Sequence, residues 1–89
     1  MGNYFRHFYA FINQNVGKQI KRQQLIELCV IKDCDTSNNT IDAYINMSKQ
    51  LGYITPVIRG VYTVNKQLPE NYTIHKLRKD YDNLNRKTV

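Results

Sequence analysis

The segment DTSNNTIDAYINMSKQLGYI, from Asp35 to Ile54, constrains the fold more than any other part of the chain. It begins with Ser and Thr residues of the kind that cap helices, and it reaches Gly52, a residue type that often ends them. Between these ends, one side of a helix collects Ile41, Tyr44, Ile45, Leu51 and the small Ser48. This spacing predicts an amphipathic helix from Ser37 or Asn38 to Gln50.

Two helices and a short extended piece are predicted before this segment. The aromatic stripe in NYFRHFYAFINQN predicts a first helix with Asn3 as its N-cap and with Asn15 and Gly17 as its stop signals. An extended piece from Lys18 to Lys21 then leads into RQQLIELCV. There we expect a short second helix whose buried side is formed by Leu25, Ile26, Leu28 and Cys29.

A hairpin and a fourth helix are predicted after Gly52. The segment YITPVIRGVYTV is rich in β-branched and aromatic residues on both sides of a turn, which is typical of two short antiparallel strands. Helical spacing resumes after Thr73, a suitable N-cap, and continues to about Asn85 or Arg86. The apolar strip of this helix consists of Ile74, Leu77, Tyr81 and Leu84.

The apolar strip of the fourth helix is too short to be stable in water, so it must pack on another surface. One possibility is the first helix of the same chain. The other is a second copy of the chain, which we favour at this stage because the aromatic stripe of the first helix must also cover its own core. We therefore predict that Ile74, Leu77, Tyr81 and Leu84 form a homodimer interface.

The charge of the chain points to an anionic partner. Its 89 residues, enough for a single domain, include 13 Lys and Arg against 7 Asp and Glu, for a formal charge of +6. No apolar run is long enough to cross a bilayer and the N-terminus has no signal-peptide layout, so we expect a cytoplasmic protein. The abundance of Asn, Ile, Lys and Tyr hints at an AT-rich source such as a phage or virus, and a viral protein would lie in the host cytoplasm.

No catalytic or metal-binding pattern is present in the sequence. His7 and His75 have no matched nucleophile, and they form no compact ligand pattern with Cys29 and Cys34. We interpret the cysteines as buried or half-buried free thiols, as in a reducing compartment. The expectation is a protein that is not an enzyme and that needs no cofactor and no metal.

The order of helix, short strand, two helices and hairpin resembles the winged helix-turn-helix family of DNA-binding domains. The resemblance is carried by QIKRQQLIEL for the first helix of the motif, SNNTIDAYINMSKQLGYI for the recognition helix and RGVYTV for the returning wing strand. It covers about residues 18–64, within one domain that spans residues 1–89 and ends in a helix at about residues 73–86. The predicted fold is therefore mainly α with a small β-hairpin.

The resemblance implies that the helix starting near Asn38 enters the major groove of double-stranded DNA while the wing touches the backbone or minor groove. The outward side of that helix carries Asn38, Asn39, Asp42, Ala43 and Asn46. Asn side chains suit adenine, a small Ala suits the thymine methyl group, and a carboxylate suits only cytosine and is repelled by phosphate. We assign phosphate contacts to Thr36, Ser37 and Thr40 near the helix start and to the basic residues Lys18, Lys21, Arg22, Lys49 and Arg59.

These patterns predict a sequence-selective DNA-binding protein that acts as a transcriptional regulator and binds as a homodimer. A rival hypothesis is a winged-helix module that holds a protein inside a viral or replication assembly. A third hypothesis is an architectural protein that binds nucleic acid without sequence selectivity. Such a protein would not need Asn38, Asn39 and Asn46.

Overall fold

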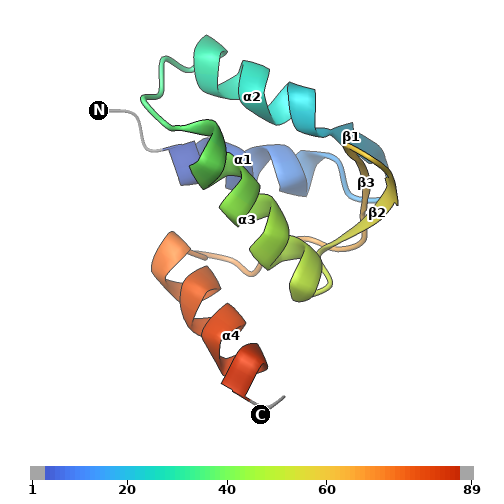
Figure 1. Cartoon of the computed structure of the whole chain (residues 1–89), viewed down its shortest axis with the longest axis vertical. Helices are drawn as coiled ribbons and strands as arrows, with labels where there is room; N and C mark the ends of the chain where they lie inside the picture. Colours follow the sequence, from blue (N-terminus) through green and yellow to red (C-terminus); the bar gives the residue numbers. More distant parts are fainter. Residues whose placement is uncertain (1–3, 87–89) are drawn as a thin grey trace.

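The computed structural model describes residues 4–86, which form four helices and one small antiparallel sheet (Figure 1). The helices are α1 (Tyr4–Gln14), α2 (Arg22–Ile31), α3 (Asn38–Gln50) and α4 (Ile74–Arg86). The strands are β1 (Gln19–Lys21), β2 (Ile54–Ile58) and β3 (Val61–Val64). This order matches the predicted one and is compatible with a winged-helix-like fold, while the predicted cap at Asn3 lies outside the described residues.

The sheet joins the hairpin to the extended piece that precedes α2. Its strand order is β1-β3-β2, so β3 lies in the middle and pairs antiparallel with both neighbours. Lys21 at the end of β1 stands opposite Val61 at the start of β3. The sequence predicted the hairpin and the extended piece separately, and their pairing is new information from the structure. It fixes the start of α2 beside the hairpin turn.

The ends of α3 and α4 are capped as the sequence predicts. The backbone N–H of Thr40 donates to the hydroxyl of Ser37 at 3.2 Å, and Gly52 follows α3 with a φ of 85°. This positive φ is in the left-handed region that glycine adopts without strain. The N–H of Lys76 donates to the Thr73 hydroxyl at 3.3 Å, so Thr73 caps α4.

The core lies where α1, α2 and α3 meet. The side chains of Tyr4, Phe5, Phe8 and Ile12 on α1 are buried, and the rings of Phe5 and Phe8 contact Tyr44 of α3 edge-on. The buried hydroxyl of Tyr4 donates to the carbonyl of Leu25 at 2.8 Å, which ties α1 to α2. The predicted aromatic stripe of the first helix is thus confirmed as core.

The position of α4 corrects the predicted place of Leu77 in a dimer interface. Figure 1 shows α4 beside α3, and the two helices are in contact. Leu77 is fully buried in the core of a single chain, whereas Ile74, Tyr81 and Leu84 are half-buried. The prediction that Leu77 faces a second chain is therefore wrong, because its own chain already covers it. Met47 of α3, which the helical pattern did not assign to the core, is also buried.

None of the helices within residues 4–86 combines the length and the apolar content that spanning a membrane requires.

Candidate nucleic-acid interface

A basic concavity lies where the start of α2, the hairpin turn and α3 meet. Its volume is about 850 Å³, and it is lined by Lys21, Arg22, Gln23, Asp42, Arg59, Gly60, Val61 and Tyr62. The structure thus brings together four of the predicted contact residues, Lys21, Arg22, Asp42 and Arg59, from β1, α2, α3 and the hairpin turn. Three of these four are cationic, so the concavity suits an anionic partner.

The hairpin turn is held in place by the start of α2. The backbone N–H of Arg22 donates to the carbonyl of Gly60 at 2.9 Å. Gly60 has a φ of 79°, and with Arg59 it forms the two-residue turn between β2 and β3. This bond and the pairing of Lys21 with Val61 both join the start of α2 to the hairpin turn. They therefore hold Arg59 beside Lys21 and Arg22.

Asp42 of α3 is bound within the chain by Arg22. The Nε of Arg22 donates to Oδ1 of Asp42 at 2.7 Å and Nη2 donates to Oδ2 at 3.1 Å, so the pair is bidentate. The hydrogen bond from Arg22 lowers the pKa of the Asp42 carboxyl below its ordinary value. This pairing changes our interpretation of Asp42, since its charge is compensated by a neighbour instead of being left to repel phosphate or to read cytosine.

Arg22 keeps hydrogen-bonding capacity after it has bound Asp42. A guanidinium carries five N–H donors, and two of them serve the carboxylate. The side chains of Arg22 and Asp42 are 39% and 47% exposed, so solvent reaches this ion pair. Arg22 is therefore available to a phosphate while Asp42 fixes its direction.

The first turn of α3 presents the predicted polar side chains to solvent. Asn38 and Asn39 are exposed and accept or donate no hydrogen bond described for residues 4–86. Ser37 and Thr40 face each other, with their hydroxyl oxygens 3.1 Å apart, and Thr36 is half-buried. Two of the predicted phosphate ligands thus already serve the helix cap, while the two asparagines are free to contact bases.

The second half of the predicted reading face lies against α4. Ala43 and Asn46 line a groove of about 270 Å³ together with Met47 of α3 and Arg78, Tyr81 and Asp82 of α4. The Nδ2 of Asn46 donates to the Tyr81 hydroxyl at 3.4 Å, and Asn46 is half-buried. Lys49, also half-buried, lies in the last turn of α3. Asn46, predicted on the outward side of the helix, is thus partly covered by α4, and its contact with a base stays a prediction.

Sequence reasoning missed several residues of these two hollows. Gln23 and Val61 were not singled out, although each is adjacent in sequence to a predicted residue or to the hairpin turn. Arg78 was not singled out at all, and no local pattern places α4 against α3, so only the fold identifies it.

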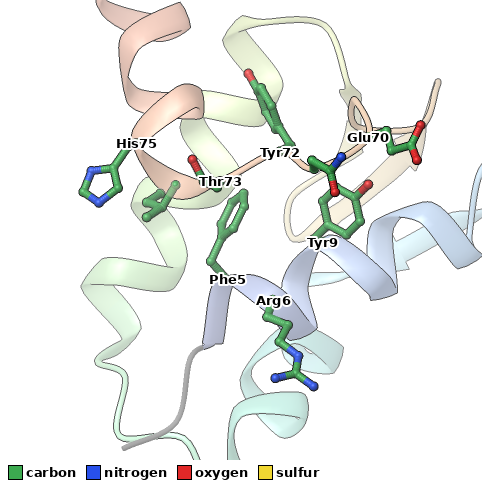
Figure 2. A pocket seen from close by; sticks show the side chains of 9 residues that line it. Phe5, Arg6, Tyr9, Glu70, Tyr72, Thr73 and His75 are labelled. Carbon is green, nitrogen blue, oxygen red and sulfur yellow. The ribbon is translucent and has the colours of Figure 1, made fainter.

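A third hollow, of about 510 Å³, lies between α1 and the segment that starts α4. Figure 2 shows Phe5 and Tyr9 rising from α1 toward residues 70–75, while Arg6 and His75 point away from the centre. The surface that faces the cavity therefore includes the rings of Phe5 and Tyr9. It differs in character from the basic concavity beside α3.

The cysteines are free, with Cys29 buried and Cys34 half-buried, as interpreted from the sequence. Within residues 4–86, no group of three or more His, Cys, Asp or Glu side chains is placed to hold a metal ion. Comparisons of the chain with protein-family models, with curated proteins and with solved structures find no match.

Proposed function

We propose that this protein is a winged helix-turn-helix protein that binds double-stranded DNA with sequence selectivity and acts as a transcriptional regulator. The observation that carries the proposal is the basic concavity of Lys21, Arg22 and Arg59 beside the exposed start of α3. Cationic side chains from β1, α2 and the hairpin turn lie next to polar, uncharged side chains on one helix. Cationic side chains suit phosphates and polar, uncharged side chains suit base edges, and the two parts of DNA lie side by side.

In the proposed complex, α3 lies in the major groove with its first turn toward the bases. Asn38 and Asn39 contact base edges, and an Asn side chain forms a bidentate pair with adenine. Arg22, Lys21 and Arg59 bind phosphates along one wall of the groove. The Arg22 to Asp42 bridge holds the cation in position and compensates the charge of the carboxylate beside the DNA backbone.

The selectivity in this proposal is tested at Asn39. Duplexes would be selected from a random pool by the wild-type protein, and their affinities would then be compared with that of a scrambled duplex. We expect Asn39→Ala to reduce discrimination by about 1 to 3 kcal/mol, as the loss of a bidentate base contact does. Asn83→Ala, an identical change at an exposed position of α4, is the matched control and should leave discrimination unchanged.

The phosphate contacts are tested at Arg59. Arg59→Ala should weaken binding to the selected and scrambled duplexes by the same factor, because backbone contacts carry no sequence information. Lys32→Ala, at the opposite end of α2, removes the same charge far from the hairpin turn and serves as the control. Equal effects of the two variants would remove Arg59 from the interface.

A second candidate function is a winged-helix module that binds another protein. Val30 and Ile31, at the end of α2 remote from the hairpin, are 75% and 74% exposed, which is unusual for large apolar side chains. This candidate is favoured if the wild-type protein fails to bind any duplex at low salt.

A further inference from the structure

The groove between α3 and α4 places a second cation beside the candidate reading face. Arg78 of α4 is exposed and lines this groove with Ala43 and Asn46 of α3. Burial raises the pKa of Tyr44 on α3, and the positive charge of Arg78 acts in the opposite direction and lowers it. Arg78 therefore lies close to α3, on the side of the helix away from Arg22.

Arg78 and Arg22 differ in how their charges are compensated. In the described part of the chain, the ion pair found is that between Arg22 and Asp42, and no carboxylate lies within ion-pair distance of Arg78. Asp82 lines the same groove one turn further along α4 without pairing to Arg78. Arg78 thus keeps all of its donors for an external anion.

The two arginines lie on opposite sides of the exposed strip of α3. One turn beyond Asn39, helix geometry places Asp42 on one side of the strip and Ala43 on the other. Asp42 is bound to Arg22, and Ala43 shares its groove with Arg78. The major groove of B-DNA is about 12 Å wide and has a phosphate backbone along each wall. A helix inserted in it therefore meets phosphates on both sides.

We propose that Arg78 binds a phosphate on the DNA strand opposite to the one held by Arg22 and Arg59, so that α4 forms the second wall of the DNA interface. This inference rests on the proposed function. Tyr81, which receives the hydrogen bond from Asn46, then joins the phosphate-binding helix to the base-reading helix. Asp82, one turn from Arg78, weakens the contact by repelling the same phosphate.

The inference is tested by a salt titration of Arg78→Gln binding to a labelled duplex of mixed sequence. Each phosphate contact scales affinity with salt concentration to a power of about −0.9, so the loss of one contact costs about eightfold at 0.1 M salt and almost nothing near 1 M. The slope of log affinity against log salt should fall in magnitude by about 0.9. Arg78→Lys, which keeps the charge, should restore the slope.

Lys79→Ala is the control for the loss of charge. Lys79 is the next residue on α4, and helix periodicity turns it nearly opposite to the buried Leu77, away from α3. At 0.1 M salt, charges more than about 10 Å from a phosphate are largely screened, so this variant should bind almost as the wild type does.

The outcomes separate this inference from the proposed function. A wild-type protein that binds no duplex overturns both. A second outcome is that Arg59→Ala weakens duplex binding, whereas Arg78→Gln and Lys79→Ala leave it unchanged. This result overturns only the role of Arg78. If Arg78→Gln does not fold, Asp82→Asn decides the question: a gain in affinity that disappears near 1 M salt supports the role of Arg78, and unchanged affinity overturns it.

Discussion

Replacement of Leu77 by Ala tests whether α4 belongs to the core of one chain. Leu77 is fully buried, and a fully buried Leu changed to Ala costs about 2.7 to 5.0 kcal/mol, depending on how far the cavity collapses. A domain of 89 residues has a free energy of unfolding of roughly 4 to 13 kcal/mol. The substitution should therefore remove a large share of the stability of the whole domain.

Leu84→Ala is the matched control, because the same chemical change is made on the same helix at a half-buried position. With less surface removed from water and a smaller cavity left behind, it should cost about 1 kcal/mol. Urea unfolding of both variants and the wild type, followed by circular dichroism, measures the three free energies. The expected result is a clear difference between Leu77→Ala and Leu84→Ala.

The same unfolding curves distinguish one chain from two. If the chain is a monomer, the midpoint is independent of protein concentration, whereas association of two chains through any surface raises the midpoint as concentration rises. A Leu77→Ala variant within about 1 kcal/mol of the wild type would refute the packing described above. Sedimentation equilibrium at micromolar concentration tests the predicted homodimer independently, since two copies could still associate through another surface.

Three further predictions concern stability. Tyr4→Phe should cost about 0.5 to 1.5 kcal/mol in urea unfolding, because it removes the hydrogen bond that the Tyr4 hydroxyl donates to the Leu25 carbonyl of α2; no loss would mean that this bond does not stabilise the fold. Ser48→Ala should raise the free energy of unfolding by about 1 kcal/mol, because the buried Ser48 hydroxyl has no partner within residues 4–86, and a loss would reveal one. Because Arg22 lowers the folded-state pKa of Asp42, the stabilisation by this pair is complete above the ordinary Asp pKa of about 3.9 and is lost as pH falls through the lowered value. Thermal melts at a series of acidic pH values should therefore show a weaker pH dependence for Asp42→Asn than for the wild type, and identical profiles would contradict the effect of the pair.

The features that the sequence predicts correctly depend on neighbouring residues. The cap at Ser37, the stop at Gly52 and the cap at Thr73 each use side chains or backbone angles within one turn of the helix end. The aromatic face of α1 follows from helical period alone. These predictions do not depend on how the elements pack, so the structure confirms them.

The features that the sequence does not predict depend on contacts between distant residues. Arg22 and Asp42 are 20 residues apart, and nothing in either segment indicates that one binds the other. Asn46 and Tyr81 are 35 residues apart, and their contact exists only because α4 packs on α3. Met47 is a further example. Helical period places its side chain outside the apolar face of α3, but the side chain is buried because α4 packs beside it.

The most direct test of the central claim is the salt dependence with which the wild-type protein binds duplex DNA. Lys21, Arg22 and Arg59, with Arg78 on the other side of α3, supply three or four phosphate contacts. At about −0.9 per contact, log affinity should fall against log salt with a slope of about −2.7 to −3.6 between roughly 50 and 200 mM salt. The account predicts binding with this slope. A flat titration, or no binding at the lowest salt, would contradict it.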